Sequence, residues 1–201
     1  MKYQEAVREL QKDSKLKKVI EHVGPCKIRV IRNRYEALID AVITQQISDA
    51  AGKAIAKRFR DIFPTYPLPI EVLNTDDSTL LSSGISRMKV QYIKNISSAI
   101  VSNQINLQKI SKNKDEDIIK ELTEIKGIGR WTAEMFLIFG LGRLDILPLG
   151  DLGLRKGIQT LYSFSENPTD ESIIKIAQKW RPYRTVATWY IWRGVRNFKN
   201  V

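Results

Sequence analysis

Asp151 is the residue of this chain best placed to take part in a reaction. It follows Pro148 and Gly150 in a short loop, and the sequence places it at or beside the N-terminus of a helix. The helix dipole and free amides there favour the ionised carboxylate. A fixed anion can stabilise the oxocarbenium-like charge that develops on a sugar when its glycosidic bond breaks, or it can orient water. Because Asp is also among the commonest N-caps, a purely structural cap is the alternative. Asp145 precedes the turn instead of the helix, and we interpret it as structural.

Residues 122–133 hold a glycine-rich turn between two apolar segments. We expect one helix to end near Ile125, the chain to turn through Gly127 and Gly129, and a second helix to start by Arg130. Glycine leaves no side chain between backbone and ligand, and the N–H groups at a helix start form an anion site. The pattern matches the helix-hairpin-helix element, which holds a DNA phosphate without reading base sequence; the alternative is an ordinary turn with glycines at a C-cap. The residues assigned to phosphate binding are Gly127, Gly129, Arg130 and Thr132.

The composition favours a polyanionic partner and excludes several kinds of site. Lys and Arg number 33 against 22 Asp and Glu, a formal net charge of +11. Neutralising phosphates releases condensed counterions, so such an excess favours nucleic acid, although many small basic proteins bind nothing acidic. Cys26 and His22 are the only residues of their kinds. One chain can therefore build no disulfide framework, four-thiolate zinc site, iron–sulfur cluster or polyhistidine metal centre.

Helical spacing of apolar residues dominates the chain, and the fold class that we predict is all-α. The hydrophobic fraction of 43% suffices for a core. Only Lys27–Arg32 alternates like a strand. No apolar run approaches the ~20 residues that a bilayer span requires, and the first residues have the pattern of an amphipathic helix, not of a signal peptide. We therefore expect a cytoplasmic, nucleoid-associated protein that contacts no membrane.

Four separated motifs occur in an order that resembles a known family. They are Thr44–Ser48, the turn at 122–133, the loop before Asp151, and Trp180–Arg184 continuing to Trp192. From about Tyr35 onward the chain resembles the helix-hairpin-helix DNA glycosylase superfamily, and within it the 3-methyladenine DNA glycosylase II, AlkA-like branch. The resemblance implies two helical lobes flanking a DNA-binding cleft. Residues 34–143 would form a central barrel lobe that includes the hairpin, and residues 1–33 with 144–201 would form the second lobe.

The resemblance also assigns roles to individual residues. Asp151 would be the catalytic carboxylate. A base that leaves the duplex creates a gap that a side chain must fill, and this wedge maps onto Gln46, with Met88 or Arg87 as a second filler. The base pocket would be lined by Trp131, Trp192, Met135 and Tyr35. The backbone carbonyls of Thr123, Ile125 and Gly127 would hold Na⁺ or K⁺, and no other cofactor is expected.

Two departures from the family pattern bear on the activity. Bifunctional relatives place a lysine just after the hairpin to form a Schiff base, and here that position is Trp131, which argues against lyase activity. Longer relatives carry an N-terminal β-rich domain, for which this chain has no room. Indole faces attract cations, and methylated purines carry positive charge and leave readily. A site with no strong general acid would suit such bases.

These features together predict a monofunctional DNA glycosylase that removes alkylated bases, of the 3-methyladenine and 7-methylguanine type, from damaged duplex DNA. We expect it to act as a monomer. Two alternatives stay open. A glycosylase for deaminated or oxidised bases would need hydrogen-bond partners for a neutral base. A non-catalytic hairpin module would need neither Asp151 nor Gln46, yet both are present.

Overall fold

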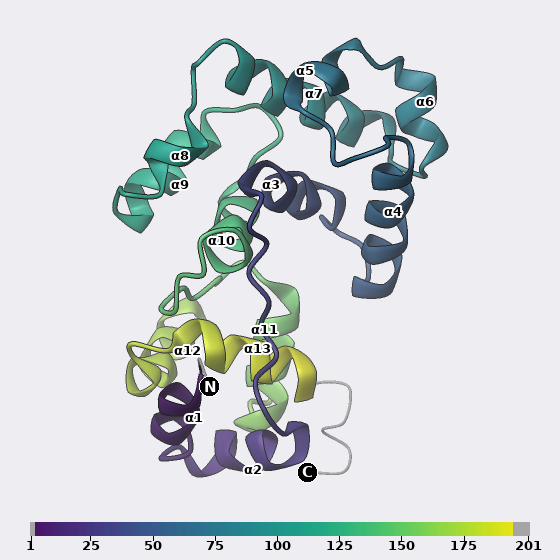
Figure 1. Cartoon of the computed structure of the whole chain (residues 1–201). Coiled ribbons are helices and arrows are strands. Elements are labelled where there is room, and N and C mark those ends of the chain that lie inside the picture. The colour runs from purple at the N-terminus through teal and green to yellow at the C-terminus, as the bar shows by residue number, and fades with distance from the viewer. Residues whose placement is uncertain (1–2, 195–201) are drawn as a thin grey trace. The chain divides into compact units, whose positions relative to one another are not determined.

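The computed structural model describes residues 3–194, and the regular structure in that range is helical, with no strand (Figure 1). The predicted all-α fold class is confirmed. Among the same residues, no helix combines the length and apolar character needed to cross a membrane. The helices are α1 (Gln4–Leu10), α2 (Ser14–Val23), α3 (Arg34–Ile43), α4 (Asp49–Asp61), α5 (Pro69–Asn74), α6 (Asp77–Ser82), α7 (Arg87–Val101), α8 (Leu107–Ile110), α9 (Asp115–Thr123), α10 (Arg130–Phe139), α11 (Leu152–Leu161), α12 (Asp170–Ala177), the 3-10 helix η1 (Gln178–Trp180) and α13 (Arg184–Gly194).

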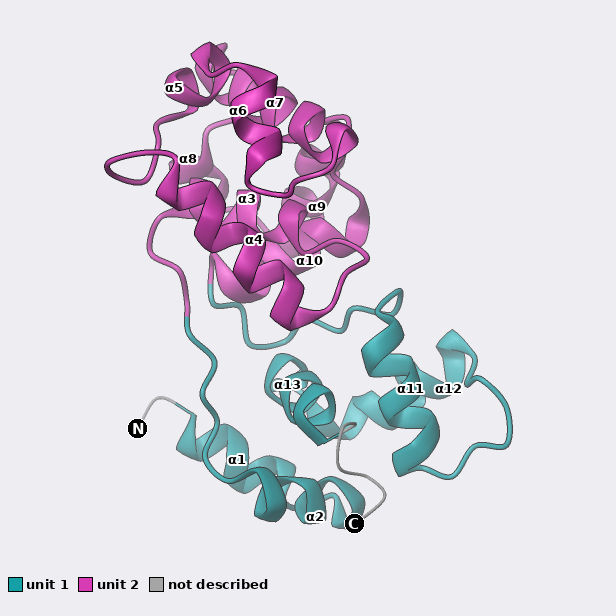
Figure 2. Cartoon of the chain, turned by 90° about the vertical axis from the view of Figure 1, so that its right-hand side faces the viewer, with its two compact units in different colours: residues 1–29, 142–201 teal, residues 30–141 magenta. Residues whose placement is uncertain are grey.

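The chain divides into two compact units (Figure 2). Unit 2 is the continuous segment 30–141, whereas unit 1 combines residues 1–29 with 142–201. The hairpin and the Gln46 loop belong to unit 2, and Asp151 belongs to unit 1. The DNA-binding lobes expected at 34–143 and at 1–33 with 144–201 stay a prediction, and residues 1–2 and 195–201 of the second lobe lie outside the described residues.

The alternating segment Lys27–Arg32 does not form a strand. A strand needs a neighbour to complete its ladder of hydrogen bonds, and residues 3–194 supply no second strand. The segment is instead irregular, and it passes from unit 1 to unit 2. Within unit 2, the Ile31 N–H donates to the Phe139 carbonyl at 2.7 Å. This bond ties the entry of the chain into unit 2 to the last residue of α10.

Unit 2 is organised around α3 and α10, which pack against each other. Leu38 and Ile43 of α3 and Phe136 and Leu137 of α10 are completely buried. The Asn33 side chain caps α3 by accepting two backbone N–H groups, which satisfies donors that a helix start leaves unpaired. Because the Gln46 loop follows α3 and the hairpin precedes α10, this packed pair of helices carries both predicted DNA-binding elements.

Unit 1 is organised around α13, which packs against α2 and α11. A second feature of this unit is the buried carboxylate of Asp13. It caps α2 by accepting the N–H groups of Lys15 and Leu16. It also accepts the Trp180 indole N–H at 3.0 Å and the Tyr162 hydroxyl, and it pairs with the Lys179 ammonium at 2.9 Å. One carboxylate thus joins the first part of the chain to segments near its end.

We expect Asp13→Asn to destabilise unit 1 at neutral pH. Burial raises the pKa of Asp13, but the hydrogen bonds from Lys179, Tyr162, Trp180 and the Leu16 amide outweigh it and lower the pKa from 3.8 to about 2. A carboxyl whose pKa falls on folding adds stability above its unfolded pKa, and that stability is lost as the pH falls through the folded pKa. The lowered pKa corresponds to about 2 kcal/mol.

Chemical denaturation of the two proteins between pH 7 and pH 2 tests this expectation. The difference in unfolding free energy is expected to be constant above about pH 5 and to shrink between pH 4 and pH 2, because wild-type Asp13 is then protonated. A difference that does not change with pH would contradict the role of the charge.

Candidate nucleic-acid interface and active site

Gly127 turns the hairpin between α9 and α10, and only glycine fits there. Its φ is +107°, and a Cβ added to it would lie 2.1 Å from Cγ of Tyr92, a residue of α7. The Ile128 N–H closes the turn onto the Ile125 carbonyl at 3.0 Å. Gly129 is different, because a Cβ at that position would meet no atom within 4 Å. The backbone that leads into α10 is therefore open to a ligand, as the predicted phosphate contact requires.

Two side chains from outside the hairpin hold it in place. The Asn95 side chain donates to the Lys126 carbonyl at 3.0 Å. The Gln45 amide donates to the Gly127 carbonyl at 3.0 Å and to the Thr132 hydroxyl at 2.8 Å. Thr132 is buried, so its backbone amide is the group left for the predicted phosphate contact. The sequence places Gln45 beside the predicted wedge but indicates neither its contact with the hairpin nor any role for Asn95, because nothing in their local sequence points to a hairpin about 30 to 80 residues away.

The Arg130 side chain is held by carboxylates within unit 2. Its guanidinium binds Glu116 at 2.6 Å and Glu134 at 3.1 Å. The hydrogen bond to Glu116 raises the pKa of Arg130 and lowers the pKa of Glu116. A phosphate at the hairpin would have to compete with two carboxylates for this side chain. The expected phosphate contact of Arg130 is therefore better assigned to its backbone amide at the start of α10.

The loop after α3 presents Gln46 in a strained backbone conformation. Gln46 is exposed and has a φ of +56°, which non-glycine residues adopt rarely. Lys89 supports this loop, because its ammonium donates to the carbonyls of Ile43 and Gln45 at 2.8 Å each. Burial lowers the pKa of Lys89. The same contact brings the start of α7 to the loop, including Met88, which is 61% exposed. Strain of this kind persists where surrounding contacts fix the backbone, and it is common at functional sites.

Asp151 is the N-cap of α11, as its position after Pro148 and Gly150 predicts. Its Oδ1 accepts the Leu154 N–H at 2.6 Å and the Trp192 indole N–H at 2.7 Å. Two donors from different helices therefore fix the orientation of the carboxyl group. A Cβ at Gly153 would lie 3.1 Å from Oδ1 of Asp151 and 3.2 Å from the Trp192 ring. The glycine after Leu152 thus allows the carboxyl group and the indole to meet.

The loop before Asp151 is held by its own turn and by Arg155. The Asp151 N–H donates to the Pro148 carbonyl at 2.9 Å. The Arg155 guanidinium donates to the Leu149 carbonyl at 3.0 Å, and it also pairs with Asp170 at 2.5 Å. Arg155 lies one turn into α11, so the helix that Asp151 caps also supports the chain that leads to it. Sequence reasoning did not assign any role to Arg155.

The four predicted base-pocket residues differ in their surroundings. Trp192 lies on α13 in unit 1, where it bonds Asp151. Trp131 lies in the first turn of α10 in unit 2 and is partly exposed. Met135 and Tyr35 are only 5% and 7% exposed, and the Tyr35 hydroxyl bonds Ser97 at 2.6 Å. Met135 and Tyr35 are packed inside unit 2, and the base-pocket role of all four residues stays a prediction.

A cavity of about 410 Å³ opens in unit 2 at the start of α3. Tyr35 is the one predicted base-pocket residue that lines it, beside Arg32, Asn33 and Arg34. The Gln46 loop follows the opposite end of the same ten-residue helix, about 15 Å along its axis. This cavity is therefore separate from the Gln46 loop.

The sequence of residues 39–182 matches the family described as HhH-GPD superfamily base excision DNA repair protein. The chain belongs to this superfamily. The match contains the Gln46 loop, the hairpin and Asp151. It confirms the family resemblance drawn from those motifs.

Two relatives in Schizosaccharomyces pombe, an alkylbase DNA glycosidase-like protein and DNA-3-methyladenine glycosylase 1, are each 36% identical to this chain. Each alignment covers 90% of the chain, with 88% and 82% of the relatives. The S. pombe 3-methyladenine DNA glycosylase in complex with abasic DNA has a TM-score of 0.89 at 34% identity, covering 96% of this chain and 97% of that one. A DNA-3-methyladenine glycosidase from Bacillus halodurans has a TM-score of 0.78 at 33% identity, covering 95% and 88%. The chain is thus similar, over nearly its full length, to proteins named as 3-methyladenine DNA glycosylases and to an alkylbase DNA glycosidase-like protein.

Proposed function

We propose that this chain is a monofunctional DNA glycosylase of base excision repair. Its substrates are alkylated purines of the 3-methyladenine and 7-methylguanine type, flipped out of duplex DNA. The observation that carries the proposal is the Asp151 carboxyl group, which two N–H donors hold at the start of α11. Membership of the superfamily and the names of the similar glycosylases support the reaction class.

Asp151 acts on the sugar of the extruded nucleotide. The bond between C1′ and the base nitrogen breaks, and its electron pair leaves with the base and neutralises the positive charge of a methylated purine. The sugar becomes oxocarbenium-like, and the Asp151 anion stabilises it and orients the water that adds to C1′. The proton that this water loses passes to Asp151 or to solvent. The leaving base needs no proton, because it is already cationic. This agrees with the composition, because His22 is the only histidine of the chain and the site has no strong general acid assigned to it.

The hairpin and the Gln46 loop bind the DNA. Backbone amides at Gly129 and at the start of α10 hold a phosphate, and the open space beside Gly129 supports this role. Gln46 fills the gap left by the extruded base, which its exposure and fixed backbone support. The carbonyls of Thr123 and Ile125 remain candidate ligands for Na⁺ or K⁺. The Gly127 carbonyl would share its oxygen between this ion and Gln45.

The proposal that the enzyme lacks lyase activity rests on the position just after the hairpin. Trp131 stands where bifunctional relatives carry that lysine. Lys126 is exposed in the hairpin turn, one residue before Gly127, and we consider it a poor candidate nucleophile. We therefore expect an abasic site as the product, with the strand intact.

Incubation with methylated duplex DNA tests the proposal. We expect release of methylated purines and abasic sites that give strand breaks only after alkali. Parallel duplexes carrying uracil or 8-oxoguanine test the alternative substrates, and faster release from either would overturn the assignment to alkylated bases. Direct nicking with a product that borohydride traps would overturn the monofunctional assignment. Binding is expected to weaken steeply with salt, because phosphate contacts dominate it.

A further inference from the structure

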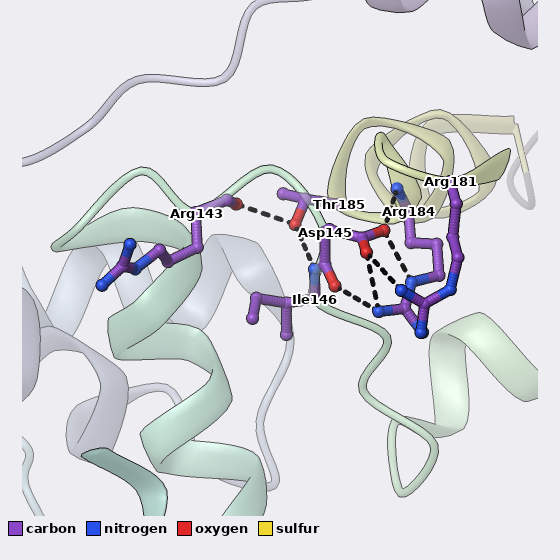
Figure 3. A network of polar contacts seen from close by, with 6 residues as sticks. All are labelled: Arg143, Asp145, Ile146, Arg181, Arg184 and Thr185. Carbon is purple, nitrogen blue, oxygen red and sulfur yellow. Dashed lines mark hydrogen bonds and ion pairs between the residues drawn. The ribbon is translucent and has the colours of Figure 1, made fainter. Parts of the chain in front are cut away.

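A second carboxylate of unit 1, Asp145, is bound by two arginines near α13 (Figure 3). Its side chain accepts Arg184 Nε at 2.6 Å and Nη2 at 2.9 Å. Arg181 adds a contact at 3.1 Å, and Arg184 Nη2 also donates to the Asp145 carbonyl at 2.7 Å. A two-pronged arginine–carboxylate pair of this kind fixes orientation as well as distance. Both side chains are mostly shielded, with 26% of Asp145 and 17% of Arg184 exposed.

Thr185, the next residue of α13, binds the backbone on both sides of Asp145. Its hydroxyl donates to the Arg143 carbonyl at 2.8 Å and accepts the Ile146 N–H at 2.9 Å. Its own N–H donates to the Leu144 carbonyl at 2.9 Å. Figure 3 shows these side-chain contacts meeting around one short stretch of chain. Residues 143–146 are therefore attached to the first two residues of α13.

The same helix holds the other end of the loop. Trp192 lies eight residues after Arg184 on α13 and binds Asp151 at 2.7 Å. Eight residues of α-helix span about 12 Å. Tyr190 and Ile191 in the interior of α13 are completely buried, so the helix is a fixed support. The loop 147–150 thus runs between two anchors on a single rigid element.

We propose that Asp145 and Arg184 are positioning residues for the Asp151 carboxylate. The proposal rests on the glycosylase function and deepens it. The contacts of Asp145 with Arg184 fix where the loop 147–150 begins. The hydrogen bonds from Trp192 and the Leu154 amide fix where it ends, so the Asp151 carboxylate has one location relative to α13. Displacing a reacting group by about 1 Å can lower a rate by 10²-fold. A role limited to general stability would instead lower the folded fraction and leave the folded enzyme at full rate.

Matched variants separate the two roles. Asp145→Asn removes the charge while keeping the size of the side chain, and Arg184→Gln removes the other partner. Arg184→Lys keeps the positive charge but loses the paired N–H donors of the guanidinium group. Asp13→Asn is the control, because Asp13 is also a buried, multiply bonded carboxylate of unit 1 but has no contact with residues 142–151 among its described partners.

The first readout is single-turnover excision from methylated duplex, normalised to the fraction of enzyme that binds a duplex with an abasic-site analogue. Asp145→Asn and Arg184→Gln are expected to lower this rate by about tenfold, and Arg184→Lys by about threefold. The dissociation constant for the analogue duplex should change by less than about twofold, because the hairpin is untouched. Asp13→Asn should lower the thermal midpoint but not the normalised rate.

The second readout is independent of activity. The chain has four tryptophans, and Trp192→Phe identifies the Trp192 indole N–H resonance by its loss from the NMR spectrum. This resonance should shift in Asp145→Asn and stay in place in Asp13→Asn, because only the first moves Asp151. Rates within twofold of wild type together with an unshifted indole would overturn the positioning role. If the wild-type protein releases no damaged base, the proposed function fails. The Trp192 indole resonance alone then decides whether Asp145 fixes the position of Asp151.

Discussion

Asp151→Asn is expected to lower the single-turnover rate of methylpurine release by about 10³-fold, while the affinity for duplex DNA stays within about twofold. Asparagine has the size of aspartate, and its Oδ1 can still accept the Leu154 and Trp192 N–H groups that bind this atom in the wild type. The loop should therefore keep its shape. The substitution removes the negative charge that stabilises the sugar cation. Release of methylated base from a saturating amount of enzyme measures the rate, and binding to an abasic-site analogue measures affinity.

Glu171→Gln is the matched control for this substitution. Glu171 is an exposed acidic residue in the first turn of α12, in the same unit. The variant removes one carboxylate charge from a helix start, as Asp151→Asn does, but it should leave the excision rate unchanged. Asp151→Asn activity above a tenth of the wild-type rate would mean that the carboxylate is only a helix cap.

Local sequence was enough to predict the features that depend on a few consecutive residues. Pro148 and Gly150 before Asp151 indicate a turn into a helix, and the structure has the N-cap at that residue. The glycines of the hairpin likewise indicate a turn with positive φ, which Gly127 adopts. Both are decided by backbone conformation and helix ends, which short-range patterns encode.

The partners of these residues could not be predicted, because they are distant in the sequence. Trp192 was expected only as a pocket wall, yet its indole binds a carboxylate 41 positions earlier. Lys89 supports the Gln46 loop from α7, and Arg130 is engaged by Glu116 of α9. A polar side chain carries no sequence signal for which of many distant partners the fold will bring to it.

The tertiary surroundings of a residue were also not predictable from the sequence pattern. Nothing in the local sequence indicates that Tyr35 is only 7% exposed inside unit 2 with its hydroxyl bonded to Ser97, and its base-pocket role stays a prediction. The alternation in Lys27–Arg32 is a strand pattern without a partner strand in the part of the chain that the structure describes. In both cases the tertiary surroundings outweighed the local preference.

Gly127→Ala is expected to disrupt the hairpin and weaken both stability and DNA binding. The added methyl group would lie 2.1 Å from the Tyr92 ring, and alanine is strained at a φ of +107°. Overpacking of this kind typically lowers stability by 1–3 kcal/mol, with about 1 kcal/mol more from the backbone conformation. Moving Tyr92 or the turn would displace the amides at the start of α10. We expect the unfolding free energy to fall by about 2–4 kcal/mol and duplex affinity to fall at least about tenfold.

Two other glycines separate the contributions to this effect. Gly24 in unit 1 has a φ of +77° and a ψ of −152°, and a Cβ there meets no atom within 4 Å, so Gly24→Ala should show only the backbone strain, about 1–3 kcal/mol. Gly129 has ordinary φ and the same open space. Gly129→Ala should therefore fold normally but bind duplex more weakly, because its methyl group faces the side from which a phosphate approaches. Wild-type DNA affinity in both Gly127→Ala and Gly129→Ala would show that the hairpin is only a connection between α9 and α10.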